Sequence, residues 1–269
     1  MAWLLVYNAV NFCYWPDRGR SRWWVRIGDR AVGQDDEALG VMAAFGAAMD
    51  AGEALWDGAR LAAMTLDELA GILAPAPGAE PLPLMPERLV GIREMGRAFQ
   101  EHGGALGLIE AACGSAIRLA RLLARVSPSW EDARVLRGER VRFLKRAQLC
   151  AAMIHGRFAG RGPGAFGDVD KLTVFADYRL PQVLRAIGMM QLDPGLAARI
   201  ERGEELVEGS VEEVEIRAVT VHAGERLRQA LLPQMPGLTA LQVDHLLWRT
   251  GVQLQDELPP FHRCRTTAY

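Results

Sequence analysis

Cysteine is scarce in this sequence, and the few cysteines are scattered. The 269 residues contain four, Cys13, Cys113, Cys150 and Cys264, with no C-x-x-C pair among them. Zinc sites usually place cysteines two to four residues apart, and disulfide frameworks need a higher cysteine density. The spacing therefore predicts neither a metal site nor a disulfide, which is typical of proteins in a reducing compartment.

Long apolar runs are also absent. No stretch reaches the roughly 20 consecutive apolar residues that span a bilayer. The start of the sequence lacks the basic region and the small-residue cleavage site of a secretory signal. We expect a cytoplasmic protein that makes no use of a membrane.

Neither sign of charge is in clear excess. With 31 basic and 33 acidic side chains, the formal net charge is -2. Such a chain has no bulk attraction for a polyanion, which argues against long nucleic acid as the main ligand. A single nucleotide remains suitable, and we expect a monomer that acts on a small molecule.

Several signature motifs are missing. The sequence contains no H-E-x-x-H, no G-x-S-x-G, no P-loop and no G-x-G-x-x-G after a predicted strand. These motifs supply zinc ligands, an exposed nucleophile or a phosphate cradle. Zinc proteases, serine hydrolases, nucleoside triphosphatases and dinucleotide enzymes thus lose their usual signatures.

Lysine is the rarest basic residue. Only Lys145 and Lys171 are lysines, and the other basic side chains are arginines. Codon bias is one explanation for this ratio. A lysine kept in an arginine-rich chain can also mark a place that needs a compact ammonium with an adjustable pKa.

Most of the chain after Asp35 has the pattern of α-helices. Ala, Leu, Met, Glu and Arg dominate, and apolar residues recur at intervals of three and four. Helix starts are indicated by capping boxes at Thr65–Glu68, Ser210–Glu213 and Thr239–Gln242 and by Asp193-Pro194. The pattern predicts helices over about 86–102, 105–125, 139–157, 181–190 and 239–256.

The first 33 residues differ from the rest, because they hold four of the seven tryptophans and are predicted to be extended. A short hairpin is predicted where Trp23–Ile27 and Arg30–Val32 flank the turn formers Gly28-Asp29. Five prolines make 74–86 the best candidate linker. The predicted fold class is mainly α with a small N-terminal β element, in one domain over 1–269 that could divide into two helical lobes near 74–86.

Two ionisable residues are candidates for chemistry. Asp177 ends the apolar run 172–176 just before a predicted helix, whose backbone donors, with Arg179 or Lys145, would keep a buried carboxylate ionised. It could instead be a simple cap, and caps greatly outnumber catalytic aspartates. Lys145 borders the apolar stretch 147–154 and could hold its ammonium in a pocket or extend it to water.

Asp244 and Trp248 form a second candidate pair. They are four residues apart, so a carboxylate and an indole share one helical face. That combination suits a flat, hydrogen-bonding base. A surface acid beside a core tryptophan gives the same pattern.

The C-terminal third offers further candidates. Glu215 shares a helical face with Val219 and His222, which a charged outer face would explain equally well. The segment 260–269 mixes aromatic residues with many hydrogen-bond donors. It could bind phosphate, or its arginines could pair with the acidic stretch 201–215.

Five blocks of the sequence carry a resemblance to a known family. They are Asn11–Trp15, Phe143–Gln148, Phe175–Leu184, Glu213–Arg217 and Pro260–Tyr269. Together they resemble the queuosine salvage family, the queuosine 5'-phosphate N-glycosylase/hydrolases. The blocks run from near the start to the last residue, so the resemblance covers essentially the whole chain.

The resemblance implies a fold like the helix-hairpin-helix DNA glycosylases, with a pocket that accepts a free nucleotide. It also implies that Asp177 and Lys145 correspond to the pair that those enzymes place at the sugar. The sequence lacks the L-P-G-V-G hairpin with its lysine shortly before the aspartate. The likeness to the DNA-acting enzymes is therefore structural.

The implied reaction is hydrolysis of queuosine 5'-phosphate to queuine and ribose 5-phosphate, without metal or cofactor. Breaking a ribosyl C–N bond passes through an oxocarbenium-like state, which an ionised carboxylate near C1' stabilises while it orients or deprotonates water. Asp177 fits that role. Queuine is a 7-deazaguanine with no N7 to protonate, so other contacts must help the base to leave.

The remaining site residues are assigned by what the substrate presents. Asp244 is the first choice for a second carboxylate, facing the donors of the guanine-like edge or the cationic amine. Candidates to stack on the base are Phe12, Trp15, Tyr178 and Trp248, and candidates for the 5'-phosphate are Lys145, Arg179, His262 and Arg263. Two alternatives stay open: a DNA or RNA glycosylase, and a non-catalytic nucleotide-binding helical protein in which Asp177 is only a cap.

Overall fold

Helices make up most of the structure, a computed structural model that describes residues 1–269. The twelve α-helices are α1 (Ala2–Ala9), α2 (Glu37–Asp50), α3 (Gly58–Ala63), α4 (Leu66–Ile72), α5 (Met85–Glu101), α6 (Ala105–Glu110), α7 (Ala116–Val126), α8 (Lys145–Arg157), α9 (Arg179–Ala186), α10 (Pro194–Glu201), α11 (Val211–Leu231) and α12 (Ala240–Gln253). The strands form three two-stranded sheets: β1 (Val25–Ile27) with β2 (Arg30–Val32), β3 (Ala133–Leu136) with β4 (Glu139–Arg142), and β5 (Glu205–Leu206) with β6 (Arg263–Cys264). The prediction of a mainly α protein is confirmed.

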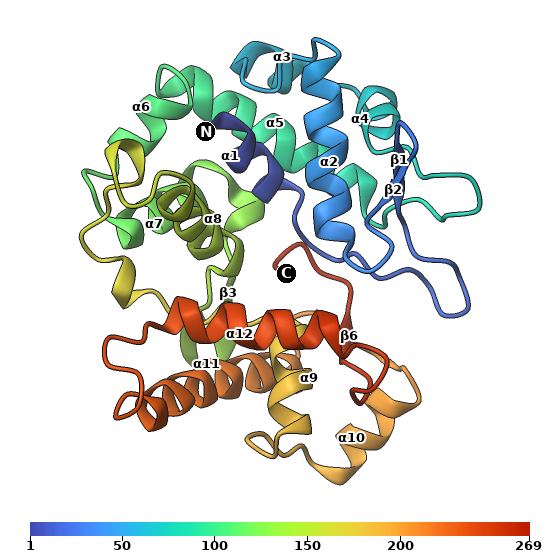
Figure 1. The fold of residues 1–269 in the computed structure, drawn as a ribbon, viewed down its shortest axis with the longest axis vertical. Coiled ribbons are helices and arrows are strands. Elements are labelled where there is room, and N and C mark those ends of the chain that lie inside the picture. Colours follow the sequence, from blue (N-terminus) through green and yellow to red (C-terminus); the bar gives the residue numbers. More distant parts are fainter.

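The helices form two groups, with α1 to α8 in one and α9 to α12 in the other, and the C-terminus lies between them (Figure 1). The first group encloses the largest apolar core, which extends from Leu4 to Leu172. The second encloses a smaller core that begins at Val174. Leu73, Leu82 and Leu89 all belong to the first core, so the proline-rich stretch 74–86 runs along that one core. The chain passes from the first core to the second near residue 173.

The predicted N-terminal hairpin is confirmed, since β1 pairs antiparallel with β2 through Val25 and Val32. A second hairpin, β3–β4, was not predicted. It turns at Arg137 and Gly138, which both have positive φ, as the tight primed turns require. The predicted helix over 139–157 is therefore wrong in its first part: strand β4 occupies 139–142, and α8 begins only at Lys145.

The prediction that the N-terminus is extended is wrong for α1. Its tryptophan, valine and tyrosine favour strands in isolation, but six of its eight residues are buried against neighbours that include α5 and α8. Gly91 of α5 permits the close approach, because a Cβ there would lie 2.5 Å from the carbonyl oxygen of Ala9. Tertiary burial thus outweighs local propensity.

The predicted helix over 105–125 is interrupted. Cys113 and Gly114 both have positive φ, which ends α6, and Ser115 then caps α7 by accepting a hydrogen bond from the Arg118 N–H at 3.0 Å. Such a break is hard to see in a sequence that stays apolar at helical spacing.

The predicted capping boxes at Thr65 and Thr239 are confirmed. At Ser210 only half of the box forms: its hydroxyl accepts from the Glu213 N–H, but the Glu213 carboxylate bonds the Gly209 N–H and the Tyr269 hydroxyl. The Glu213 carboxylate therefore bonds to groups inside the protein and does not complete the capping box.

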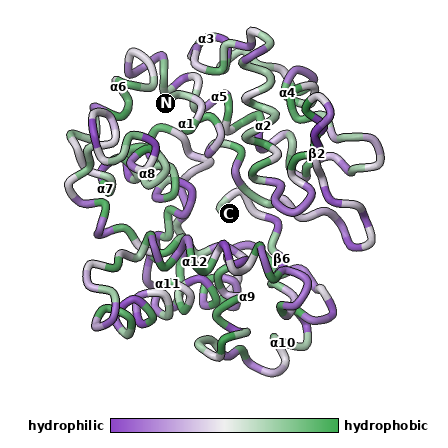
Figure 2. The backbone as a smooth tube through the Cα atoms, viewed as in Figure 1, coloured by the Kyte–Doolittle hydropathy of each residue, from purple (hydrophilic) through white to green (hydrophobic).

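Hydrophobic and hydrophilic residues alternate along helices such as α11 (Figure 2), as expected where one face packs inward. None of the helices combines the length and apolar character needed to cross a membrane.

Candidate active site

A cavity of about 330 Å³ lies between the two groups of helices. Its walls come from α1 and the segment after it, the N-terminal part of α2, α8, the segment 175–179, α12 and Tyr269. Seven of the residues singled out from the sequence line it together: Phe12, Lys145, Asp177, Tyr178, Arg179, Asp244 and Trp248. The volume lies at the lower end of the range, roughly 300–1,000 Å³, that small-molecule sites occupy.

Asp177 stands just before α9, where it serves as a cap and also faces the cavity. Its Oδ1 accepts hydrogen bonds from the N–H groups of Arg179 at 2.8 Å and Leu180 at 3.0 Å. The other oxygen, Oδ2, accepts no hydrogen bond from the protein. The two roles considered from the sequence are therefore compatible, because one oxygen caps the helix and the second is free for a ligand.

Lys145 is the first residue of α8, and its backbone N–H donates to Asp132 Oδ2 at 3.1 Å. The side chain is buried, yet the ammonium makes no hydrogen bond or ion pair within the protein. Burial lowers the pKa of Lys145, while the nearby carboxyl groups of Asp177 and Asp244 act to raise it. The ammonium is thus held inside the cavity with its donors unused.

Asp244 projects from α12 into the same cavity. Its Oδ1 accepts the N–H of Phe175 at 2.7 Å, and its Oδ2 has no partner in the protein. Burial raises the pKa of Asp244 to about 8, with the neighbouring Asp177 adding to the effect, whereas the Phe175 hydrogen bond and Lys145 act in the opposite direction. The raised pKa favours the neutral carboxylic acid form of Asp244 near pH 7.

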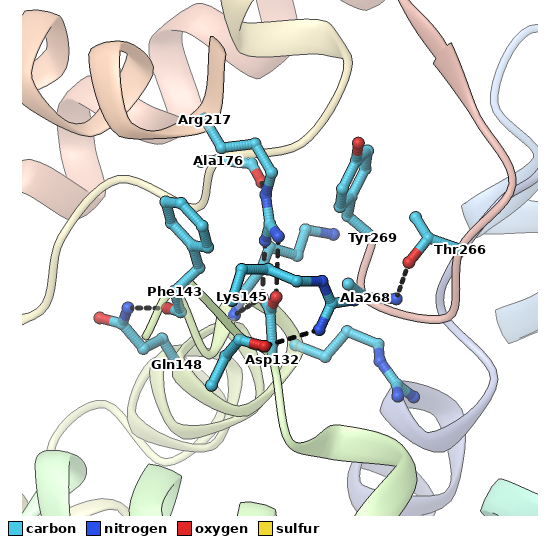
Figure 3. A network of polar contacts seen from close by, with 12 residues as sticks. Asp132, Phe143, Lys145, Gln148, Ala176, Arg217, Thr266, Ala268 and Tyr269 are labelled. Carbon is cyan, nitrogen blue, oxygen red and sulfur yellow. Dashed lines mark hydrogen bonds and ion pairs between the residues drawn. The ribbon is translucent and has the colours of Figure 1, made fainter. Parts of the chain in front are cut away.

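A buried ion pair holds the catalytic candidates in place (Figure 3). Arg217 of α11 binds Asp132 through two hydrogen bonds of 2.7 and 2.6 Å, and its Nε donates to the carbonyl of Ala176 at 3.1 Å. Asp132 also accepts the N–H of Lys145. This arrangement connects the start of α8 to the residue that precedes Asp177.

Aromatic rings form much of the remaining wall. Phe12 is buried between the guanidinium groups of Arg88 and Arg146, which lie 4.5 and 4.9 Å from its ring centre. Tyr178 packs against Phe261 with ring centres 4.7 Å apart. Such packed rings offer rigid faces on which a flat base can stack.

Tyr269 brings the C-terminal segment to the cavity wall. Its hydroxyl donates to Glu213 Oε1 at 2.9 Å, and its carbonyl oxygen accepts the N–H of Cys13 at 2.9 Å. His262 contacts the same hydroxyl through Nε2 at 3.2 Å but does not line the cavity. Burial lowers the pKa of His262 to about 3, so this imidazole is neutral and unsuited to attract a phosphate.

Trp15 and Arg263, predicted as substrate-binding residues, also lie outside the cavity. They pack on each other, with the guanidinium of Arg263 4.2 Å from the indole ring centre, and Arg263 donates to the carbonyl of Pro16. The aromatic and basic character of the two segments thus serves to dock the C-terminal segment onto the N-terminal one.

Glu215 lies outside the cavity as well, on the outer face of α11, where it pairs with Arg137 at 2.7 Å. Two residues earlier on the same helix, Glu213 is almost fully buried and holds Tyr269. Glu215 thus belongs to a charged outer face of α11, which is the alternative that was considered from the sequence.

Other lining residues were not assigned a role from the sequence, and they include Tyr7, Asn11, Asp36, Glu37, His245 and Tyr269. Asp36 caps α2 by accepting the Ala38 N–H, and Glu37 pairs with Arg22 at 2.6 Å. Asn11 and Tyr269 fall within blocks that carry the family resemblance. The other lining residues could not be singled out from the sequence. A helix cap or a residue on a helix face has the same sequence pattern whether its side chain points into a cavity or toward solvent.

Comparison with known proteins identifies the family of this chain. The family model described as queuosine salvage protein matches residues 1–269. The relatives named queuosine 5'-phosphate N-glycosylase/hydrolase include one from Sphaerobacter thermophilus, 40% identical over 99% of this chain and 80% of its own length. Relatives of the same name occur in Dictyostelium discoideum (32% identical, 99% of this chain and 77% of the relative) and Mus musculus (30% identical, 100% and 82%).

Proposed function

The chain belongs to the queuosine salvage protein family, and we propose that it is an N-glycosidase that hydrolyses queuosine 5'-phosphate to queuine and ribose 5-phosphate. The observation that carries this proposal is Asp177, a buried carboxylate with one oxygen free in a cavity that Phe12 and Trp248 also line. Relatives named for this activity align with nearly all of the chain.

Asp177 acts at the sugar. As the C1'–N9 bond breaks, positive charge develops at C1', and a fixed carboxylate stabilises that charge and orients the attacking water. The two backbone donors that hold Oδ1 fix the side chain before the substrate arrives. Lys145 lines the same cavity, and the unused donors of its ammonium fit the polar groups of the ribose.

The aromatic wall receives the base. Phe12, Tyr178 and Trp248 line the cavity from three separate segments, and a good base–aromatic contact contributes roughly 1–3 kcal/mol. Tight stacking suits a substrate whose leaving group cannot be activated at N7.

Arg179 is the residue we assign to the 5'-phosphate. Among the residues that line the cavity, only Lys145 and Arg179 carry lysine or arginine side chains, and Lys145 lies beside Asp177 and Asp244. The guanidinium of Arg179 donates to Gln255 at 3.2 Å and to the carbonyl of Gly251 at 3.5 Å, and these contacts orient it before binding.

The architecture we propose is a helix-hairpin-helix glycosylase-like fold acting as one unit, in a cytoplasmic monomer whose ligand is a small molecule. Support comes from the family resemblance, from an aspartate directly before a helix at the reacting position, and from a cavity whose walls come from both groups of helices. The near-zero net charge fits a nucleotide ligand better than a nucleic acid.

Base release from defined substrates tests the function. Purified protein is incubated with queuosine 5'-phosphate, queuosine or guanosine 5'-phosphate, with and without chelator, and the products are separated by chromatography. We expect queuine and ribose 5-phosphate from the first substrate, little reaction with guanosine 5'-phosphate, and no effect of chelator. Absence of queuine, or release of base only from tRNA or DNA, would reject the proposal.

A further inference from the structure

The proposed reaction leaves one chemical requirement unmet, and a second aspartate of the cavity meets it. When the C1'–N9 bond breaks, its electron pair goes to the base, and a 7-deazaguanine has no N7 that could have been protonated beforehand. Departure as an anion is slow, so a proton donor to another ring atom would lower the barrier. This inference rests on the function proposed above.

The charges inside the cavity favour one protonated carboxyl group. Asp177, from the segment before α9, and Asp244, from α12, line the same cavity as Lys145, from α8, whose single ammonium attracts both carboxyl groups without forming an ion pair with either. Two buried carboxylates beside a single ammonium leave one negative charge without a partner, and burial makes that arrangement unfavourable.

The other groups along the cavity do not remove this imbalance. Glu37 is paired with Arg22, and Asp36, whose pKa is raised by burial, is a further carboxyl group and brings no cation. Arg179 is directed toward Gln255 and the carbonyl of Gly251, and His245 lies on the outer part of α12 against Trp248. Helix α11 packs on α12 but contributes no side chain to the cavity.

Hydrogen bonding decides which carboxyl group keeps the proton. Asp177 accepts two backbone N–H groups at the start of α9, where the helix dipole also favours negative charge. Asp244 accepts only one, from Phe175, within the second turn of α12. The proton therefore belongs on Asp244, in agreement with the rise of the pKa of Asp244 to about 8.

We propose that Asp244 is the general acid of the reaction and donates its proton to the leaving base. Trp248 lies one turn further along α12, so a base stacked on that indole is next to the carboxyl group. Oδ1 is fixed by the Phe175 N–H, and the free Oδ2 carries the proton toward the cavity.

The step balances as follows. The C1'–N9 electron pair moves to the base while the Asp244 proton binds a ring nitrogen of the base, which gives queuine with an uncharged ring system and an Asp244 carboxylate. Water adds to C1', and its proton passes to Asp177. Transfer of that proton back to Asp244, directly or through solvent, restores the starting state.

The variant Asp244→Asn tests the proposal, because asparagine keeps an acceptor for the Phe175 N–H but has no acidic proton. The two substrates are queuosine 5'-phosphate and 4-nitrophenyl ribofuranoside 5-phosphate, whose nitrophenolate leaves without protonation. Glu94→Gln is the matched control: Glu94 is buried to the same extent and hydrogen-bonded to Ser127 and to the Ser129 N–H, but it lies outside the cavity.

For Asp244→Asn we expect kcat on queuosine 5'-phosphate to fall about 100- to 10,000-fold with little change in KM, while hydrolysis of the nitrophenyl substrate stays near that of the unaltered protein. The fall in kcat/KM as pH rises through about 8 should disappear in this variant and persist in Glu94→Gln. Asp177→Asn should lose both activities.

Three results would overturn the assignment: equal losses on the two substrates, a rise in KM at unchanged kcat, or a pH profile that keeps its upper limb in Asp244→Asn. The variant Asp244→Glu, which retains an acid, should recover part of kcat and thus separates loss of the proton from misfolding. Failure of the unaltered protein to release queuine would reject the proposed function itself, whereas full activity of Asp244→Asn would reject only its role as acid.

Discussion

Asp177 and Asp244 differ in their local hydrogen bonds, which is the basis for the two different chemical roles that we propose for them within one cavity. Asp177 accepts two backbone N–H groups at a helix start, and Asp244 accepts one inside a helix. Pairs of carboxyl groups whose environments differ in this way are a common basis for dividing acid and base work in glycoside cleavage.

The buried acid should also affect stability. Because the pKa of Asp244 rises from 3.8 to about 8 on folding, the folded state holds this proton more tightly than the unfolded chain. The resulting stabilisation is fully present below about pH 4 and is lost as pH rises toward 8. Asp244→Asn should therefore lose less stability than the unaltered protein between about pH 5 and pH 8.5.

Urea unfolding of both proteins at the two pH values measures this difference. All other titrating groups are common to the pair, so the change in their stability difference isolates Asp244. Parallel pH dependence would show that Asp244 is ionised in the folded state.

At the level of single residues, the sequence predicted which side chains belong to the site where they end an apolar run or share a helical face with an aromatic ring. Asp177, Asp244 and Trp248 are of this kind, and all three line the cavity. Glu215 shows the limit of such reasoning, because Glu213, two positions earlier, turns inward and Glu215 outward. Which face of α11 is buried depends on packing with elements distant in sequence.

At the level of elements, the pair formed by Asp132 and Arg217 fixes the relative position of α8, α11 and the segment before α9. Both side chains are almost fully buried, and Arg217 also lies 4.1 Å from the ring centre of Phe143. Asp132 holds the N–H of Lys145, and Arg217 holds the carbonyl beside Asp177. The ion pair thus positions both catalytic candidates without touching the substrate.

Removing one partner should be costly. Arg217→Met leaves the Asp132 carboxylate buried without its cation, and we expect a loss of about 3–5 kcal/mol in the free energy of unfolding. Arg140→Met, which removes an exposed partner of Glu131, should cost no more than about 1 kcal/mol. Urea unfolding measures both, and equal costs would contradict the positioning role of the buried pair.

Element boundaries were predictable where local chemistry decides them and not where packing does. The capping boxes at Thr65 and Thr239 start helices as expected. The residues of α1 favour strands, yet they form a helix because it is buried on several sides. The stretch 139–142, predicted as helix, pairs with β3 instead, because the turn at Arg137 and Gly138 directs it there.

At the level of the whole molecule, the cavity depends on both ends of the chain. The segment 260–269 reaches the N-terminal segment through the Cys13 N–H and the α11 helix through Glu213. The pairing of the tail with the acidic stretch 201–215, one of the two alternatives considered from the sequence, is confirmed by Arg265 and Glu205. The contact with Cys13 and the change of core near residue 173 could not be predicted, since both depend on contacts between distant positions. The mainly α class, by contrast, followed from periodicity alone.

Deleting residues 262–269 should open this wall. The deletion removes Tyr269 from the cavity and its bond to Glu213, so we expect a lower Tm and loss of the Tm increase that queuosine 5'-phosphate gives the full chain. Arg265→Ala, which removes an exposed side chain paired with Glu205, should retain the ligand-induced increase. A deleted protein that is still stabilised by the nucleotide would contradict the placement of the site at Tyr269.

The central claim is that Asp177 is the carboxylate at the reacting sugar, and Asp177→Asn tests it most directly. Asparagine can keep the hydrogen bonds to the N–H groups of Arg179 and Leu180 but carries no charge. Binding of queuosine 5'-phosphate to this variant is measured by calorimetry, and queuine release is measured in a single turnover. The account predicts that binding persists while queuine release falls at least about 1,000-fold; release at a rate near that of the unaltered protein would contradict it.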